Sequence, residues 1–589
     1  MKIFEANITQ RVSIFLNEYL KNVISFDLAN QKLIDGFGIM NFFENNDELN
    51  VLKETTSEIN STVEENNRAE YGDFQTNAKL ADQVSLKLLA KNINPKIIVE
   101  PTCGKGNFII ASLKNFKAIQ FIYGVEVYKP YIWETKFGIV NFFLENPKNN
   151  KPAIFITHSD VFDFNFNKIS KEHSKAEILI IGNPPWVTNS KLGSLNSSNL
   201  PRKTNFKKMR GLDAMTGKGN FDIAESITLK LIEAFQSMKG NLLLLVKNSV
   251  IKNIIFSQNK NQYRIAFFEK ECIDSKKEFN VSVEASLFYC KLNSDPGLIC
   301  KEFNFYDSTN SYLKFGWLND KFVSNIDTYV FTKHIDGESH FVWRQGLKHD
   351  CSAIMELNKV NGHYVNGLNE EIKLEDGLVY GILKSSDLKN TVINQTRKFT
   401  IVTQKKVGQE TRYIKSEYPK TYKYLIEHQE NFNSRKSSIY LNKPLFSIFG
   451  IGDYSFKPYK VAISGLYKTF HFTLILPQNN KAVMLDDTCY LIGFEKIEYA
   501  VYTLILLNSE TTVQFLQSVT FPDAKRTFTK DVLMRISLLA LTKSVKQNDL
   551  KLELERLNTM YNFNLTLNLW ESFMKEITPL KSEQIAMFG

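Results

Sequence analysis

The sequence predicts an α/β fold around a mainly parallel sheet, because short apolar runs alternate with helical segments between residues 71 and 295. The runs are continuously apolar, which is typical of strands that helices cover on both faces. Beyond Ser294-Asp295-Pro296 the strands become short and aromatic, and turn residues are frequent. The chain therefore divides into an N-terminal helical segment with an acidic linker (1–70), an α/β domain (71–295) and a C-terminal domain of mixed α+β structure (296–589).

The first elements are helical. Ile8, Val12, Phe15, Leu16 and Tyr19 have helical spacing, and the polar, acidic stretch from Glu54 to Glu70 indicates a linker. Thr76 is expected to cap a helix that runs through Leu80, Val84 and Leu89.

Five apolar runs predict the strands of the sheet, and polar residues or glycine follow several of them directly. These runs are 97–99, 121–125, 154–156, 178–181 and 242–246. A helix from Phe221 to Met238 is expected between the fourth and fifth strands. Because carboxyl ends of parallel strands meet at one edge of a sheet, the residues after these strands are the candidates for function.

Composition excludes several classes of protein. With 589 residues, 43% hydrophobic and 23% charged, the chain is neither disordered nor fibrous. No apolar window reaches the ~20 residues of a membrane span, and charges interrupt the start, so a soluble, cytoplasmic protein is expected. Six cysteines form no CxxC pair and eight histidines show no ligand-like spacing. We therefore expect no metal site.

The net charge of +10 is unevenly distributed. Residues 1–70 contain six basic and twelve acidic side chains, a net charge of −6, so the rest of the chain has an excess of 16 positive charges. Such an excess is compatible with a polyanionic partner. An A·T-rich genome also enriches lysine, so charge alone leaves nucleic acid an open question.

The loop after the first strand contains Gly104 and Gly106, whose lack of a side chain allows the backbone to approach a ligand closely. Glu126 ends the second strand, 20 residues beyond Gly106, where an acid fits the two hydroxyls of a ribose. Asp160 follows the third strand and is a candidate acceptor for an adenine amino group. A tight turn and helix caps are the alternative explanation. Acids after three successive strands, starting with Glu100, favour a nucleoside ligand.

Asn183-Pro184-Pro185-Trp186 follows the fourth strand and is the most specific signal in the sequence. Two prolines make a rigid turn without N–H donors, and Asn183 adds a side-chain acceptor. Trp186 adds a flat aromatic face. Two acceptors beside an aromatic ring suit an amino group on a planar base. A simple Pro-Pro turn with a packed Trp is the alternative.

The heptapeptide from Glu100 to Gly106, followed by Asn183-Pro184-Pro185-Trp186, resembles the S-adenosylmethionine-dependent DNA adenine-N6 methyltransferases. The order of cofactor motif, tetrapeptide and C-terminal region is that of the Taq-type (gamma) class. The resemblance extends over about residues 71–293. It implies a Rossmann-like class I methyltransferase domain and a C-terminal target-recognition domain.

The resemblance also implies roles for single residues. Phe74-Gln75-Thr76 resembles the segment whose Thr contacts the methionine end of the cofactor, although the family usually continues with Pro where this chain has Asn77. Cofactor positions matched by the family pattern and the glycine loop are Thr76, Glu100, Thr102, Gly104, Gly106, Glu126 (ribose), Asp160 and Val161 (adenine), and, in a loose alignment, Phe221. Phe279 matches an aromatic that stacks on the target base opposite the tetrapeptide, and Trp186 stands where Tyr or Phe is more common.

The implied reaction is site-specific methylation of adenine N6 in double-stranded DNA, as part of restriction–modification or phage defence. The adenine is expected to rotate out of the duplex, with Asn183 Oδ1 and the Pro184 carbonyl accepting its amino hydrogens. Pro185 and Trp186 complete this catalytic tetrapeptide. The resemblance requires neither a metal nor a covalent intermediate. A separate cognate endonuclease is an expected partner, and a membrane is not.

The C-terminal region mixes basic and aromatic residues in a way that suits phosphate and base contacts. We expect DNA contacts from Arg435, Lys436, Lys457, Lys460, Lys525 and Arg526. For any one of these residues, an ordinary surface role in a β-rich domain is the favoured explanation, whereas DNA binding is favoured for the region as a whole.

Three other functions are compatible with part of the sequence. A methyltransferase acting on RNA or on a protein glutamine shares the tetrapeptide but usually lacks so long a C-terminal region. A bifunctional restriction–methylation polypeptide needs a nuclease domain, and residues 1–70 contain no convincing Asp…Glu-x-Lys centre. A non-catalytic DNA-binding subunit is disfavoured because both motifs are intact.

Overall fold

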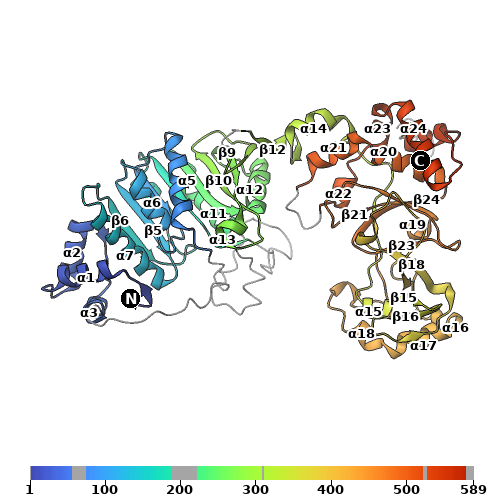
Figure 1. The fold of residues 1–589 in the computed structure, drawn as a ribbon, viewed down its shortest axis with the longest axis horizontal. Helices are drawn as coiled ribbons and strands as arrows, with labels where there is room; N and C mark the ends of the chain where they lie inside the picture. Colours follow the sequence, from blue (N-terminus) through green and yellow to red (C-terminus); the bar gives the residue numbers. More distant parts are fainter. Residues whose placement is uncertain (1, 56–73, 187–221, 308–310, 522–526, 579–589) are drawn as a thin grey trace, which may run out of the picture. The chain divides into compact units, whose positions relative to one another are not determined.

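The structure is a computed structural model that describes residues 2–55, 74–186, 222–307, 311–521 and 527–578. The chain forms two compact units, Met1–Phe322 and Val323–Gly589. Figure 1 shows the first unit in blue to green and the second in yellow-green to red.

A single large sheet forms the centre of the first unit. Within the described residues its strand order is β13-β12-β11-β9-β10-β8-β7-β4-β5-β6-β3. The strands are β3 (Ile39–Met40), β4 (Ile97–Glu100), β5 (Phe121–Glu126), β6 (Ala153–His158), β7 (Ile178–Gly182), β8 (Gly240–Lys247), β9 (Ile265–Cys272), β10 (Ala285–Leu292), β11 (Ile299–Asn304), β12 (Leu313–Leu318) and β13 (Lys321–Val323).

The five predicted strands are confirmed as β4 to β8, and they are parallel neighbours in the order β6-β5-β4-β7-β8. Strand β10 then runs antiparallel between β8 and β9. Strands β4 and β7 are buried along their whole length, which explains their continuous apolar runs. The expected Rossmann-like, mainly parallel sheet is therefore present.

Helices cover this sheet (Figure 1). Helices α5 to α7 contribute to one core cluster together with alternate residues of the strands, such as Ile98, Ile122 and Ile154. Helices α8, α11 and α12 pack with one another as a second group. The bounds are α5 (Ala78–Ala90), α6 (Asn107–Asn115), α7 (Lys129–Glu145), α8 (Phe166–Glu172), α11 (Ile223–Phe235), α12 (Asn248–Asn261) and α13 (Ser275–Phe279).

Thr76 does not cap α5, contrary to the prediction. The N-cap is Asn77, whose side-chain oxygen accepts a hydrogen bond from Leu80 N at 2.8 Å. Thr76 is buried and its hydroxyl contacts Asn183 instead. Both residue types cap helices well, so the sequence pattern did not discriminate between neighbouring positions.

The described N-terminal residues form a layer of the first unit, with the elements β1 (Lys2–Ile3), β2 (Ala6–Asn7), α1 (Gln10–Leu20), α2 (Phe26–Phe37), β3 and α3 (Asn46–Thr55). The predicted helix over 8–19 is confirmed as α1. Strand β3 pairs in parallel with β6 and so extends the sheet. Phe4 stacks on the buried Trp133 of α7 at 4.2 Å between ring centroids. Most of the predicted linker lies outside the described residues.

The boundary between the units lies at 322/323 rather than near 295. Strand β11 pairs in parallel with β9, and β12 pairs with β11, so residues 299–318 continue the first sheet. The change to short aromatic strands therefore marks additional sheet strands and not a new domain.

The second unit contains two smaller sheets, with strand orders β14-β24-β21-β22-β19 and β17-β16-β15-β20-β18-β23 within the described residues. The strands are β14 (Arg344–Gln345), β15 (Glu356–Val360), β16 (His363–Val365), β17 (Glu371–Ile372), β18 (Val379–Leu383), β19 (Val392–Ile393), β20 (Lys398–Ile401), β21 (Tyr459–Ser464), β22 (Thr473–Ile475), β23 (Met484–Leu485) and β24 (Cys489–Phe494).

Helices surround these sheets, and the unit is of mixed α+β structure as predicted. They are α14 (Ile326–Thr332), α15 (Ser352–Met355), α16 (Tyr413–Glu417), α17 (Pro419–Glu427), α18 (Gln429–Asn433), α19 (Asp453–Phe456), α20 (Ile497–Leu507), α21 (Glu510–Val519), α22 (Lys530–Leu533), α23 (Leu538–Ser544), α24 (Gln547–Tyr561) and α25 (Trp570–Ile577). In the described part of the chain, no helix has the length and apolar character needed to cross a membrane.

Candidate active site

The loop between β4 and α6 requires both of its glycines. Gly104 and Gly106 have φ values of +51° and +75°, in the left-handed region that favours glycine. A Cβ atom on Gly104 would collide with the side chain of Gln75, and one on Gly106 would lie 2.7 Å from Thr135 Cγ2. The loop therefore forms a narrow turn at the carboxyl end of β4.

Glu126, at the end of β5, holds this loop from the neighbouring strand. Its Oε2 accepts a hydrogen bond from Gly104 N at 2.8 Å, and its Oε1 accepts from Val127 N and Tyr128 N at 2.9 Å each. Thr135 of α7 donates to the Gly104 carbonyl at 2.8 Å. A carboxylate oxygen has more than one lone pair, so Glu126 keeps capacity for further donors.

Glu100 is a buried carboxyl group next to this turn. Burial, together with the nearby Glu126, raises the pKa of Glu100 well above its ordinary value, although the Ile109 amide opposes the shift. Its Oε2 atom is buried and accepts no hydrogen bond within the described residues. A buried acceptor without a partner is costly, and such a group is often completed by a ligand.

Asp160 and Val161 follow β6 at the same edge of the sheet. Asp160 Oδ1 accepts from Phe162 N at 2.8 Å, and Lys230 of α11 donates to the Phe162 carbonyl at 2.5 Å. Asp160 is partly exposed and Val161 is buried. Phe221, the remaining predicted adenine contact, lies outside the described residues.

Asn183, directly after β7, is held by the segment before α5. Its Nδ2 donates to the Phe74 carbonyl at 2.6 Å and to Thr76 Oγ1 at 3.2 Å. This orientation leaves Oδ1 as the amide atom that can still accept a hydrogen bond. The Oδ1 atom is buried and has no partner within the described residues. The Thr102 hydroxyl donates to the Asn183 carbonyl at 3.4 Å, which connects the tetrapeptide to the β4–α6 loop.

Trp186 lies in an aromatic cluster beside this amide. It is only 5% exposed, and its indole N–H donates to the Leu245 carbonyl of β8 at 3.2 Å. Its ring centroid is 5.4 Å from that of Phe74 and 5.1 Å from that of Phe279, whose ring is nearly perpendicular to it. Pro184 is buried and Pro185 is partly exposed. The fold thus brings Phe279 to the tetrapeptide, as expected.

Several contacts of the site were not found from the sequence. Phe74, which the sequence analysis names only as a neighbour of Thr76, contributes a main-chain carbonyl, a role that no sequence pattern reports. Thr135 and Lys230 act from helices far along the chain by holding loop carbonyls. The proximity of Phe74 to the expected Thr76 was the single available signal.

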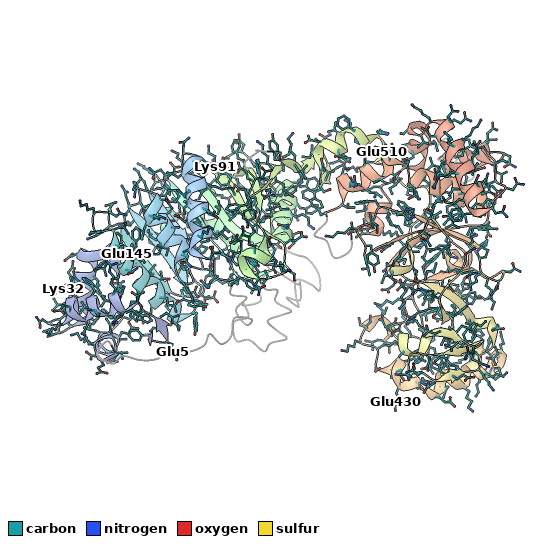
Figure 2. All side chains as sticks on the ribbon, in the orientation of Figure 1. Glu5, Lys32, Lys91, Glu145, Glu430 and Glu510 are labelled. Atoms are coloured by element: carbon teal, nitrogen blue, oxygen red, sulfur yellow. The ribbon has the colours of Figure 1, made fainter. Side chains whose placement is uncertain are left out.

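The predicted DNA-binding cations of the second unit differ in their surroundings. Of these cations, Lys436 is exposed. Its exposure is ordinary for a charged side chain, as it is for Lys91 and Glu430, which Figure 2 labels. Arg435 is different: its guanidinium donates to the Phe432 and Ser447 carbonyls and lies 3.7 Å from the Tyr440 ring centroid. Arg435 therefore stabilises the unit internally.

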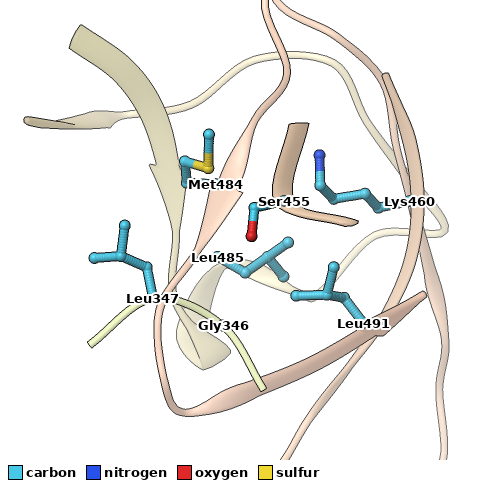
Figure 3. A pocket seen from close by; sticks show the side chains of 7 residues that line it. All are labelled: Gly346, Leu347, Ser455, Lys460, Met484, Leu485 and Leu491. Carbon is cyan, nitrogen blue, oxygen red and sulfur yellow. The ribbon is translucent and has the colours of Figure 1, made fainter. Parts of the chain in front are cut away.

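Lys460 is 1% exposed and corrects the prediction most clearly. It is the second residue of β21, and it lines a small hollow together with Gly346, Leu347, Ser455, Met484, Leu485 and Leu491 (Figure 3). Its ammonium donates to the Lys457 carbonyl at 2.6 Å, and burial lowers the pKa of Lys460 to about 7. Lys457 pairs with Glu495, and Lys525 and Arg526 lie outside the described residues.

Comparison with known proteins gives matches along most of the chain. A family model described as N-6 DNA Methylase matches residues 60–333. The Type II methyltransferase M.NspV of Nostoc sp. (strain ATCC 29411 / PCC 7524) is 40% identical over 486 residues. That match covers 82% of this chain and 99% of the relative.

Solved structures with a similar arrangement include the Type IIL restriction-modification enzyme MmeI in complex with DNA, with a TM-score of 0.48 and 12% identity. The match covers 86% of this chain and 74% of MmeI. A nuclease-deletion mutant of the Type ISP restriction-modification enzyme LlaGI, in complex with a DNA substrate mimic, matches with a TM-score of 0.42 and 11% identity. It covers 94% of this chain and 62% of that one.

Proposed function

The chain belongs to the family of N6-adenine DNA methyltransferases, and on that premise we propose that the edge of the sheet formed by β4 to β7 is its active site. Membership makes the protein an S-adenosylmethionine-dependent DNA methyltransferase of a restriction–modification system, specific for adenine N6.

The cofactor is assigned to the loops after β4, β5 and β6. Glu126 would hold the ribose hydroxyls, Asp160 and Val161 the adenine, and Thr76, Glu100, Thr102, Gly104 and Gly106 the methionine end. Two observations support this fit. The turn at Gly104 and Gly106 has no room for a side chain, and Glu100 Oε2 is a buried acceptor that the cofactor's ammonium group would satisfy. When bound, S-adenosylmethionine supplies an electrophilic methyl group on a sulfonium.

The orientation of Asn183 is the observation that carries the catalytic assignment. Because Nδ2 donates to Phe74 O and Thr76 Oγ1, Oδ1 is fixed as an acceptor before any substrate binds. We place the target adenine with one amino hydrogen on this Oδ1 and the other on the Pro184 carbonyl. Such preorganised acceptors localise the nitrogen lone pair and orient it for in-line attack on the methyl group.

A base in duplex DNA cannot reach this edge while it is stacked, so the target adenine must leave the helix. Trp186 and Phe279 would then contact its faces. The ring centroids of Trp186 and Phe279 are 5.1 Å apart. Two rings that hold a third between them must be about 7 Å apart, because each face of the inserted ring needs one van der Waals contact of about 3.5 Å. Base entry therefore requires Phe279, on the short helix α13, to move away from Trp186.

The second unit would select the target sequence, and a separate endonuclease would recognise the same sequence. Both assignments follow from the resemblance and the length of the chain. The test of the endonuclease is cleavage protection: extracts of the source organism should cut unmodified DNA at the methylated motif and leave modified DNA intact.

Long-read sequencing of DNA from a host that expresses the protein tests the catalytic assignment. The wild-type chain should produce N6-methyladenine at one motif, and Asn183→Ala should abolish it while cofactor binding by the purified protein stays near normal. Asn261→Ala, a substitution of an exposed Asn on α12, serves as the matched control. Undiminished methylation by Asn183→Ala would refute the assignment.

A further inference from the structure

Two loops of the second unit are joined to each other. The first, residues 404–412, connects β20 to α16, and the second, residues 434–445, follows α18. The hydroxyl of Thr411, near the end of the first loop, donates to the carbonyl of Leu445, at the end of the second, at 2.5 Å. Thr411 is buried, so this bond is shielded from water.

Two further buried side chains reinforce this junction. The Thr403 hydroxyl donates to the Phe446 carbonyl at 2.8 Å, and Gln404 Oε1 accepts from Ile448 N at 2.9 Å. Both Thr403 and Gln404 are at most 1% exposed. Because water does not compete for buried hydrogen bonds, the two loops keep one position relative to each other.

The tip of the first loop is a tight turn. Gln409 N donates to the Lys406 carbonyl at 3.2 Å, and Gly408 has a φ of +79°, as a type II turn requires of its third residue. The side chain of Gln404 donates to the Gln409 carbonyl and so closes the turn. Val407, the second residue of this turn, is 48% exposed.

The second loop contains a turn of the same construction. Lys443 N donates to the Tyr440 carbonyl at 3.3 Å, and Asn442 has a φ of +57°. Leu441, the second residue, has the φ and ψ of a type II turn, −62° and 132°, and is 69% exposed. The Arg435 guanidinium lies 3.7 Å from the Tyr440 ring centroid and holds the start of the turn. Each turn therefore presents one apolar side chain to solvent, at the same position.

The charged side chains around the two turns are nearly all basic. Glu410 is the acidic residue of the two loops, and it pairs with Arg412 at 3.7 Å. Four lysines are exposed and form no ion pair within the described residues, namely Lys405, Lys406, Lys436 and Lys443. Uncompensated positive charge on rigid loops suits a polyanion.

We propose that these two turns contact DNA, with the four lysines on phosphates and with Val407 and Leu441 against the bases. The inference rests on the proposed function, in which the second unit selects the target sequence. A thymine methyl group is the apolar feature of a base edge in the major groove, and an apolar side chain also enters between base steps. Such contacts depend on sequence, whereas phosphate contacts do not. The lysines thus supply affinity, and Val407 and Leu441 supply specificity.

The two roles differ in a measurable way. Val407→Ser and Leu441→Ser should each weaken binding to a duplex carrying the methylated motif about fivefold or more, and leave binding to a scrambled duplex and the salt dependence unchanged. Lys436→Ser/Lys443→Ser should weaken binding to both duplexes equally and lower the salt slope by about 2. In a host that expresses Leu441→Ser, long-read sequencing should show methylation at motifs altered in one position.

Leu552→Ser is the matched control, because Leu552 is 65% exposed on α24 of the same unit. It should bind both duplexes as the wild type does. Melting temperatures should show that all variants fold.

Two results would overturn the inference. One is a folded Val407→Ser or Leu441→Ser protein that keeps the wild-type ratio of affinities for the two duplexes, which includes the case of turns that bind a protein instead. The other is an unchanged salt slope in the lysine variant. Failure of the proposed function gives a different result, namely a wild-type chain that methylates no adenine.

Discussion

At the scale of single residues, Glu100 illustrates a conflict between stability and function. The side chain is buried, its Oε2 has no partner within the described residues, and Glu126 lies nearby. A carboxyl group in such a place destabilises the free protein when it ionises. The same carboxylate is what a bound ammonium group requires, so we interpret this destabilisation as the cost of a preformed subsite.

Glu100→Gln should therefore stabilise the free protein in a pH-dependent way. The carboxyl ionises near pH 4.5 in the unfolded chain and at higher pH in the folded one. In that window the folded protein holds a proton that the unfolded chain has released, so the free energy of unfolding falls as pH rises. At pH 8 the melting temperature of Glu100→Gln should exceed that of the wild type by about 2–4 °C for each kcal/mol of stabilisation. At pH 5 the two melting temperatures should differ little.

The same variant should bind sinefungin, a non-reactive analogue of the cofactor, about tenfold more weakly, because the charged acceptor is lost. Glu134→Gln on α7 is the control variant, because it also removes one carboxylate, in this case one that contacts Asn7 and Lys105. It should not show the pH-dependent gain in melting temperature that is expected for Glu100→Gln. If Glu100→Gln melts at the wild-type temperature at both pH values, the carboxyl group is not destabilised by burial.

Some residues of the proposed site follow from local sequence rules and others do not, for physical reasons. Gly104, Gly106 and Asn183 can be recognised in the sequence, because backbone geometry or hydrogen bonding requires each residue type at one position after a strand. Thr76 was placed at a helix cap because local rules favour it there, whereas a partner 107 positions away determines its orientation. Long-range contacts of this kind leave no periodic signal in the chain.

At the scale of elements, continuous apolar runs predicted β4, β7 and β8 because these strands are buried on both faces, and β5 and β6 because apolar residues fill their buried face. Strand β11 was missed as part of the same sheet, since short, half-buried strands near the end of a sheet look like those of an independent β-rich domain. Strand β21 shows the opposite error. Its Lys460 suggested a surface strand, but β21 lies between β22 and β24 and is buried over nearly its whole length.

Lys460→Met should stabilise the second unit without affecting DNA binding. The ammonium has an ordinary pKa of 10.5 and a pKa of about 7 in the folded protein. Between these values the unfolded chain holds a proton that the folded protein has released, so stability rises with pH. Met keeps the apolar stem and removes this dependence, and the gain in urea resistance should be larger at pH 6 than at pH 9.

Lys457→Met is the control for this prediction, because Lys457 lies three residues away, is more exposed and pairs with Glu495. It should show no comparable difference between pH 6 and pH 9. A destabilised Lys460→Met protein would mean that the bond to the Lys457 carbonyl outweighs the burial of the ammonium.

At the scale of the whole molecule, the positive charge is concentrated in two stretches of the sequence. Residues 187–221 contain seven basic side chains and one acidic one, and lie outside the described residues. Residues 389–443, in the second unit, contain twelve basic and four acidic side chains. The excess of positive charge over residues 71–589 is thus local, as a binding surface for phosphates requires.

Lys405 and Lys406 are the best place to test this surface. They are adjacent, exposed, and located between β20 and α16, and neither forms an ion pair within the described residues. Each phosphate contact releases a condensed counterion, so log K falls by about 0.9 per contact for each tenfold rise in salt. If both lysines contact phosphates, Lys405→Ser/Lys406→Ser should lower the slope of this plot by about 2 and weaken binding equally for all sequences.

The double substitution Lys168→Ser/Lys171→Ser removes the same charge from exposed positions on α8 and controls for net charge alone. It should change the salt slope far less, because counterion release depends on phosphate contacts and not on the total charge of the protein. Fluorescence anisotropy between about 50 and 300 mM salt, with a motif-bearing duplex and a scrambled one, measures both slopes. Equal slopes for wild type and Lys405→Ser/Lys406→Ser would place the phosphate contacts elsewhere, and the basic stretch after the tetrapeptide would then be the next to substitute.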